Sequence, residues 1–392
     1  MTEKFLPEDR SDFLPVQSGF TNRLAARLGL LQPASRRLFR ILLLIVVAWI
    51  PLVVLAGASG HITGDLVAIT LLEDPEVNCR FLIAMPFLEL AEVFLAVSLT
   101  AQVRQFLNSG IVSEKQRSRF EAIRAKVQRA HQAPHSEAIM LAIAFGTSLM
   151  MRLFVLADFS STWERQSNVI TLAGWWHLLV SLPLLYFFLL RALWVFGLWT
   201  WFLCCVSRLD LELTATHPDH AGGLGFLGWG LASFAPTVLS FSTVVSAGFA
   251  YEIYHRGESL QTLKYHLIAF VLLVTFIIHL PVLPFAVRLA RTRFQGLLEF
   301  SALVWRHDRA FDEKWIQQPQ SENHESLLGT ADVQSLADIA TAYGHVDEMG
   351  IIPLDTKAVT VIAMACVIPL LPLVGTEIPL QEIIAKLGEL LV

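Results

Sequence analysis

The chain has 392 residues, of which 54% are hydrophobic and 16% are charged, and its mean hydropathy is +0.56. A soluble globular protein carries about 25% charged residues, so this composition excludes a soluble enzyme, a disordered chain and a basic nucleic-acid-binding protein. The formal net charge of −5 says little, because the charges are spread very unevenly. We therefore expect an all-α membrane protein, a polytopic transmembrane helix bundle.

Seven apolar stretches are long enough to cross the membrane, because a bilayer core about 30 Å thick needs roughly 20 apolar residues per helix. In chain order they lie near 40–58, 81–101, 139–157, 177–200, 227–250, 267–287 and 357–375. The first begins about 40 residues into the chain, which indicates a retained span and not a cleaved signal peptide.

The spans and the segments around them divide the chain into four regions. Residues 1–39 form an N-terminal arm with an amphipathic stretch from Phe20 to Leu31, and the transmembrane bundle follows over 40–287. Residues 288–356 are expected to be a cytoplasmic helical segment with a polar loop, and 357–392 hold the last span and an amphipathic tail. The connection 113–131 is also predicted to be a helix.

The distribution of lysine and arginine predicts the orientation. One alternate set of segments holds 22 of these residues, and it comprises 1–40, 102–138, 208–226 and 288–357. The other set holds 4, and it comprises 59–80, 158–176 and 251–266. Because the basic side of a membrane protein is normally cytoplasmic, the N-terminus is predicted to be inside. The same basic face suits anionic lipid headgroups.

Five ionisable residues fall within the predicted spans, namely Glu89, Glu92, Arg152, Arg191 and His279. Each is costly there, since a central charged residue costs about 2.5–3.5 kcal/mol on insertion scales. Glu89 and Glu92 share one helix face, because they are three residues apart.

Depth along the helices suggests how these charges pair. With a rise of about 1.5 Å per residue, Glu89 matches Arg152 and Glu92 matches Arg191 within the reach of an arginine side chain. Two alternatives stay open: the pairs lock three spans together, or they line a hydrated passage for a cation or proton. In such a passage the neighbouring like charge and desolvation both raise the pKa of one carboxyl. His279 is either a further relay group or a hydrogen bond between helices.

Eight prolines and one hydroxyl-rich span add a second feature. Proline frees a backbone carbonyl and permits a kink, and prolines occur in every predicted span except the third. The span 227–250 is rich in Ser, Thr, Gly and Ala, which serve either close helix packing or the lining of a polar pathway.

The connection 214–226, TATHPDHAGGLGF, contains His217, Asp219 and His220 within four residues. It lacks the histidine spacing of a zinc hydrolase loop and follows a predicted membrane helix, so we discount catalysis there. Two alternatives remain: a weak divalent-ion or pH-sensing site, or a tight turn that leads the chain into the next span.

Three motifs carry a resemblance: FLIAMPFLELAE at 81–92, THPDHAGGLGF at 216–226, and LLGTADVQSLADIA at 327–340 with its continuation to IIPLD at 351–355. They resemble motifs of an uncharacterised family of bacterial multi-spanning inner-membrane proteins. The resemblance implies that location and one integrated domain, but no activity, cofactor or site residue.

We expect an inner-membrane ion transport protein, a channel or a proton-coupled carrier, that forms a homo-oligomer and uses no cofactor. In this hypothesis Glu89 and Glu92 exchange the cation, Arg152 and Arg191 set their charge, and His279 tunes access. The alternative from another class is a sensor or scaffold that presents cytoplasmic helices to a partner. No nucleophile or phosphate-binding motif indicates an enzyme.

Overall fold

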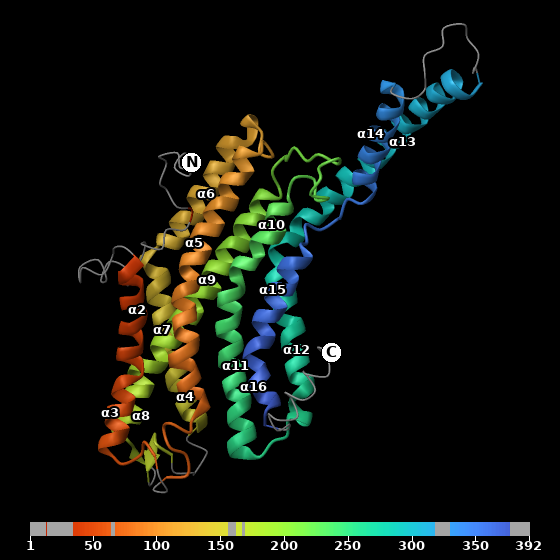
Figure 1. Ribbon diagram of the computed structural model, residues 1–392. Coiled ribbons are helices and arrows are strands. Elements are labelled where there is room, and N and C mark those ends of the chain that lie inside the picture. Colours follow the sequence, from red (N-terminus) through yellow and green to blue (C-terminus); the bar gives the residue numbers. More distant parts are fainter. Residues whose placement is uncertain are drawn as a thin grey trace.

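The computed structural model describes Phe13 and residues 34–63, 67–155, 162–166, 169–317 and 330–376. Within these ranges the chain is almost entirely helical, as its composition predicts, and a two-residue hairpin, β1 (Arg165–Gln166) and β2 (Val169–Ile170), is the one sheet (Figure 1). The predicted amphipathic segments Phe20–Leu31 and 380–392 lie outside the described residues.

The part of the first half that the structure describes contains six helices and one π-helical turn. They are α2 (Ala34–Ala48), α3 (Ile50–Ala58), α4 (Pro75–Cys79), η1 (Arg80–Ala84), α5 (Met85–Asn108), α6 (Glu114–Gln132) and α7 (Pro134–Val155). The α6 helix coincides with the helix predicted over 113–131.

The second half continues after the hairpin. It comprises α8 (Leu172–Trp176), η2 (His177–Ser181), α9 (Leu182–Val206), α10 (Gly225–Gly230), η3 (Leu231–Phe234), α11 (Ala235–Arg256), α12 (Leu260–His279), η4 (Leu280–Phe285), α13 (Ala286–Phe311), η5 (Asp312–Gln317), α14 (Ala331–Asp347), α15 (Thr356–Val367), η6 (Ile368–Leu370) and α16 (Leu371–Val374).

Proline accounts for most of the irregular turns inside the long helices. The π-helical turns η1 and η2 end just before the helices that begin with Pro86 and Pro183 at their first turns, and the 3₁₀ turn η3 precedes Pro236 in the same way. The 3₁₀ turn η4 itself contains two prolines. Proline has no N–H and its ring crowds the carbonyl four residues earlier, so the backbone locally widens or tightens its hydrogen-bonding pattern.

Within the described ranges, six helical segments are long and apolar enough to cross a membrane. They are Phe39–Ala58, Pro75–Asn108, Leu172–Val206, Gly225–Arg256, Leu260–Gln317 and Thr356–Val374. They correspond to six of the seven predicted spans. The remaining one corresponds to α7, which is a helix of 22 residues but is not among the six, and the side chains of its last four residues lie outside the described part.

Two helices, α5 and α9, organise the bundle. The α5 helix packs against α2, α9 and α11, whereas α9 also packs against α6 and α7. Two apolar clusters form around them: one joins α5, α6, α9 and the start of α13, and the other joins α3, η1, α7 and α9. Their shared helices make one continuous body.

The hydroxyl-rich helix α11 uses its polar side chains for packing. Ser242 and Ser246 donate to the carbonyls of Cys366 and Pro369 on the neighbouring α15–η6 segment. Ser240 and Thr243 donate to carbonyls one turn back in their own helix. The structure therefore supports the packing alternative for this span, because these hydroxyls are occupied by backbone acceptors.

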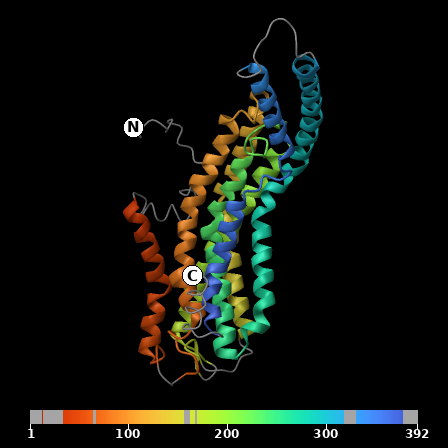
Figure 2. The ribbon, with the colours of Figure 1, turned by 45° about the vertical axis from the view of Figure 1, so that its right-hand side comes forward.

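A helical arm extends beyond the bundle. Figure 2 shows α13 and α14 side by side past the end of the other helices. Their free ends are joined by Asp332, which accepts from Lys314 Nζ at 2.6 Å and from Trp315 Nε1 at 3.0 Å. Arg293 donates to the Asp347 carbonyl near the bundle, so the pair is fastened at both ends.

Phe106 lies at the centre of the larger apolar cluster, so its substitution tests how much this cluster contributes to stability. It is fully buried, and its ring lies 5.0 Å from Phe226 and 5.9 Å from Phe120, centroid to centroid. Phe106→Ala should lower the free energy of unfolding by about 3–5 kcal/mol through lost contacts and a cavity. The measurement is thermal unfolding in detergent. Phe94→Ala on the same helix, whose side chain is 53% exposed, should change it little.

Candidate functional site

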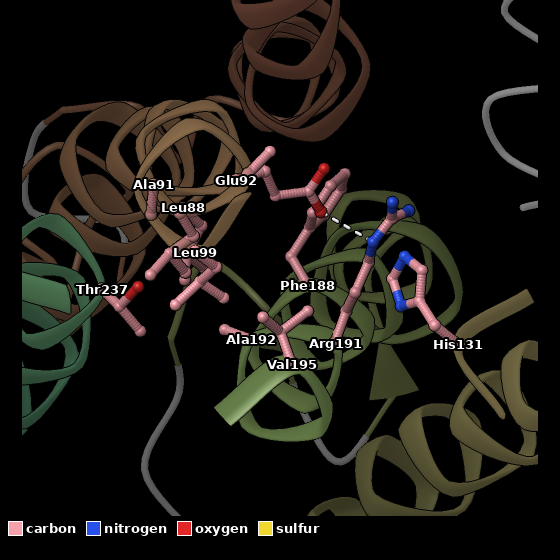
Figure 3. Close-up of a pocket in the computed structure, with 12 residues that line it drawn as sticks. Leu88, Ala91, Glu92, Leu99, His131, Phe188, Arg191, Ala192, Val195 and Thr237 are labelled. Carbon is pink, nitrogen blue, oxygen red and sulfur yellow. Dashed lines mark ion pairs between the residues drawn. The ribbon is translucent and has the colours of Figure 1, made fainter. Parts of the chain in front are cut away.

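Glu89 and Glu92 lie on one face of α5, and each is held by an arginine from a different helix. Glu89 is 4% exposed, and its Oε1 lies 2.8 Å from Arg40 Nη2 on α2. Glu92 Oε1 lies 2.7 Å from Arg191 Nε on α9, and that arginine is 5% exposed (Figure 3). The two ion pairs thus join α2, α5 and α9.

The sequence predicted one of these two pairs. Matching depths placed Glu92 beside Arg191, and the structure brings them together. Glu89 instead binds Arg40, because α2 begins at Ala34 and carries Arg40 into the bundle as part of the first membrane-length helix. Arg152 belongs to α7, but its side chain lies outside the described residues.

One ion pair involves the start of the first membrane-length helix. Arg40 is the second residue of the candidate span Phe39–Ala58. Figure 3 shows His131, near the end of α6, beside Arg191. The helical segment that carries Glu89 begins at Pro75 and not near residue 81, so Glu89 lies about 21 Å along it at 1.5 Å per residue, near the middle of its 34 residues. The mid-membrane depth of the two acids stays a prediction.

A small cavity adjoins the Glu92–Arg191 pair. It lies between α5 and α9, has a volume of about 30 Å³, and is lined mainly by apolar side chains, with His131 from α6 and Thr237 from α11 (Figure 3). A water molecule needs at least about 10–15 Å³ of such space, so one or two waters fit. The cavity is too small for an ion with its hydration shell.

In the described part of the chain, each of the two carboxylates has one oxygen without a hydrogen-bond partner. Glu89 Oε2 and Glu92 Oε2 are buried and have no hydrogen-bond partner among the described residues. Thr237 Oγ1, on the wall of the same cavity, is likewise buried and has no hydrogen-bond partner among the described residues. Buried polar groups are normally satisfied. A water or a proton in the cavity would supply the missing contact of Glu92.

His279 lies apart from this group, at the end of α12. It is 8% exposed, and its Nδ1 lies 2.6 Å from the Thr275 carbonyl one turn earlier in the same helix. The hydrogen bond is thus within the helix and not between helices as one alternative expected. Nε2 has no partner among the described residues, and His279 does not line the cavity between α5 and α9.

The segment with His217, Asp219 and His220 forms a tight turn organised by Asp219. Its Oδ1 accepts from the N–H groups of Ala221 and Gly223 at 2.9 and 3.1 Å, and its Oδ2 accepts from Gly225 at 2.7 Å. Partial burial raises the pKa of the Asp219 carboxyl, but these three donors and His217 outweigh it, and the pKa falls below its ordinary value.

The backbone explains the glycines that follow. His220 has φ of 51°, and Gly222 and Gly223 have φ of 64° and 96°. Glycine adopts this left-handed region without the steric cost of a Cβ. In the part of the chain that the structure describes, no three His, Cys, Asp or Glu side chains group as a metal site requires. The contacts therefore support the turn and not the divalent-ion site.

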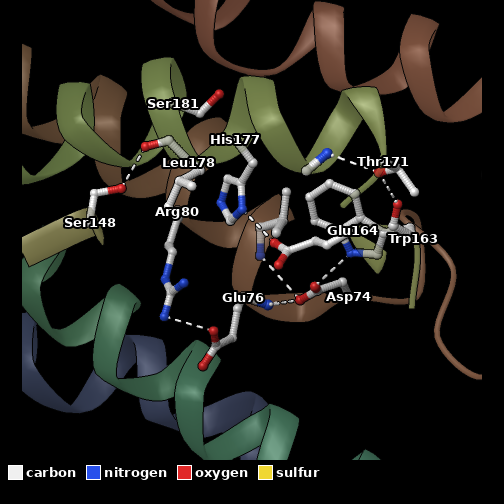
Figure 4. A network of polar contacts seen from close by, with 12 residues as sticks. Asp74, Glu76, Arg80, Ser148, Trp163, Glu164, Thr171, His177, Leu178 and Ser181 are labelled. Atoms are coloured by element: carbon white, nitrogen blue, oxygen red, sulfur yellow. Dashed lines mark hydrogen bonds and ion pairs between the residues drawn. The ribbon is translucent and has the colours of Figure 1, made fainter. Parts of the chain in front are cut away.

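One polar cluster was missed by the sequence reasoning. Asp74, which caps α4, Glu76 of α4 and Arg80 of η1 meet Glu164 from the loop before β1 and His177 from η2 around a second cavity (Figure 4). The residues come from three separate segments, so spacing could not reveal the cluster. The acidic run around Glu73 and Asp74 and the lone His177 at the start of a span were the available signals.

Comparison of the chain with family models, with curated proteins and with solved structures found no match.

The Glu92–Arg191 pair can be tested by breaking it. Arg191→Met should lower the free energy of unfolding by about 3–5 kcal/mol, because it leaves a buried carboxylate without its cation. The Arg191→Met/Glu92→Leu double variant should recover part of this loss. Thermal unfolding in detergent measures both. Removing the exposed Arg117–Glu114 pair, 2.9 Å apart, should cost about 0–1 kcal/mol; an equal cost for both pairs would contradict the argument.

The Asp219 turn predicts a pH dependence. Because the folded pKa lies below the unfolded one, ionised Asp219 stabilises the turn at neutral pH, and this stability is lost as the pH falls through the folded pKa. Amide hydrogen exchange at Ala221, Gly223 and Gly225 should therefore accelerate, relative to its ordinary pH dependence, in acid. Asp219→Ala should accelerate it at neutral pH, whereas Asp210→Ala, whose side chain is 88% exposed, should not.

Proposed function

We propose that the protein transports an ion across the membrane, with Glu89 and Glu92 as the groups that exchange it. The observation that carries this proposal is the pair of buried carboxylates, each with one oxygen unpartnered among the described residues, one of them beside a cavity. Intramembrane acids are rare because of their cost, and they commonly mark ion pathways and proton relays.

The size of the cavity favours a proton as the exchanged species. A space for one or two waters permits proton transfer between water and a carboxylate, but it does not admit a hydrated metal ion. Arg40 and Arg191 each form an ion pair with one of the two acids, and breaking either pair leaves a buried carboxylate that a proton can neutralise instead. This favours a proton-coupled carrier over an open channel.

The membrane setting completes the proposal. We place the protein in a bacterial inner membrane with a cytoplasmic N-terminus, and we count α7 with the six membrane-length helices to give seven spans. The support is the excess of lysine and arginine on one set of connections. Anionic lipids on that side and a second copy of the chain are the proposed partners. In this proposal His279 tunes the access of the ion to Glu89 and Glu92.

A sensor or scaffold function is the second candidate, and the arm of α13 and α14 favours it. The arm exposes large apolar side chains: Phe294, Leu298, Trp305 and Ile316 are between 59% and 64% exposed. Apolar surface of this kind beyond the bundle suits a protein partner. This reading predicts a bound partner and no ion flux.

Flux measurements distinguish the two functions. The purified protein in liposomes with a pH-sensitive dye inside should dissipate an imposed pH gradient, and Glu89→Gln or Glu92→Gln should reduce the rate at least tenfold. Glu114→Gln, a change of the same kind at a residue whose side chain is 84% exposed, is the matched control. The unfolding temperatures of Glu89→Gln and Glu92→Gln are measured first, so that a loss of flux can be told from a loss of folding. Glu92→Asp, which keeps the carboxylate on a shorter side chain, tests whether the charge alone supports flux. Flux equal to wild type in Glu89→Gln and Glu92→Gln would sink the proposal.

A further inference from the structure

The second cavity lies at the end of the bundle opposite the arm. It has a volume of about 100 Å³ and is lined by Asp74, Glu76 and Arg80 on one side and by Glu164 and His177 on the other. Two of these residues, Arg80 and His177, are the first residues of the π-helical turns η1 and η2. Such turns interrupt the regular helix and frequently occur at functional sites.

His177 is held in one orientation. It is 5% exposed, its ring lies edge-on to Phe81 at 5.7 Å, and the Trp163 ring lies 5.3 Å away on another side. Its Nδ1 is 2.5 Å from Glu164 Oε1. An ionised carboxylate only accepts hydrogen bonds, so Nδ1 carries the hydrogen, and Nε2 of the neutral ring presents a lone pair.

That lone pair faces the cavity without a protein partner. His177 Nε2 is buried and has no hydrogen-bond partner among the described residues. Figure 4 shows the ring nitrogen away from Glu164 turned to the side of Arg80 and Glu76. A buried acceptor without a donor is unfavourable, so this position calls for a water or a protonated species.

Acidic side chains surround the imidazole. Glu76 forms an ion pair with Arg80, whose Nη2 lies 2.8 Å from its Oε2. Asp74 accepts from Trp163 Nε1 and from the N–H groups of Glu76 and Val77, which fix it in place, and burial raises the pKa of its carboxyl. Glu164 is the carboxylate in direct contact with the ring, through Nδ1.

The other lining groups leave the site to a proton. Ser148 donates its hydroxyl to the Leu178 carbonyl, and Tyr186 is the remaining titratable residue on the wall. No three suitable metal ligands gather in the described residues. The cavity of about 100 Å³ has room for water, and a proton delivered by water needs only one acceptor atom, which His177 Nε2 supplies.

We propose that His177, oriented by Glu164, is a proton-binding group at this end of the protein. A hydronium ion in the cavity gives its proton to Nε2 and leaves as water, while Nδ1 keeps its hydrogen bond to Glu164; release is the reverse. A role of this site as the entry point for protons rests on the proposed function. Its Arg80 lies nine residues, about 14 Å, before Glu89 on the same continuous helical segment.

Nitrogen NMR of protein labelled with ¹⁵N-histidine tests the site without any flux measurement. The resonances lost in His177→Gln assign the ring. At high pH they should show a protonated Nδ1 and a bare Nε2, and acidification should convert Nε2 to the protonated form. Glu164→Gln should move the midpoint down by about one pH unit or more, whereas Glu258→Gln, an exposed residue at the same end, should leave it in place.

Three results would overturn the proposal: a ring with hydrogen on Nε2 at high pH, no titration between pH 4 and 9, or a midpoint that Glu164→Gln leaves unchanged. The tautomer of the wild-type ring and the titration midpoint in Glu164→Gln can be measured even where His177→Gln fails to fold, so the proposal remains testable. Normal titration together with absent flux would remove the proposed transport and keep the proton site, so the two failures are distinguishable.

Discussion

The structure depends on keeping two carboxylates buried within an apolar bundle. Desolvation of a carboxylate costs several kcal/mol, and only close opposite charges with good geometry offset it. Arg40 and Arg191 supply these charges from two different helices, α2 and α9, so these two helices and α5, which apolar contacts alone would leave free to slide, are fixed in register. Any change in the position of α2 or α9 alters the charge balance at α5, which is how the scaffold and the proposed transport are connected.

The helices were predictable from the sequence, because a membrane-length helix needs an uninterrupted apolar run that few other structures contain. The helix bounds were less so: Pro75–Asn108 is 34 residues long, and polar residues at both ends extend it past the apolar run. The expected pairing of Glu92 with Arg191 is nevertheless found, because both residues lie inside helices whose course the apolar runs define.

Contacts between distant segments were beyond the reach of spacing arguments. Arg40 counts as part of a basic arm in sequence, and its partner became evident only once α2 was seen to enter the bundle. His177 and Glu164 are joined by the folding of the hairpin back over η2, which no local pattern encodes. The Asp219 turn, by contrast, is made by backbone donors only two, four and six residues further along the chain, which is why the sequence could offer it as one of two alternatives.

The break at η4 lies inside the bundle and sets where the arm begins. Leu260–Gln317 is a 58-residue helical segment, but the 3₁₀ turn Leu280–Phe285 interrupts its α-helical hydrogen bonds where Val282 and Phe285 are fully buried. The part beyond this turn, 286–317, is roughly 48 Å long at 1.5 Å per residue. Its first turn is anchored, since Leu289 is fully buried and Arg288 Nε donates to the Ser207 carbonyl at 2.7 Å, so the arm projects from a fixed base.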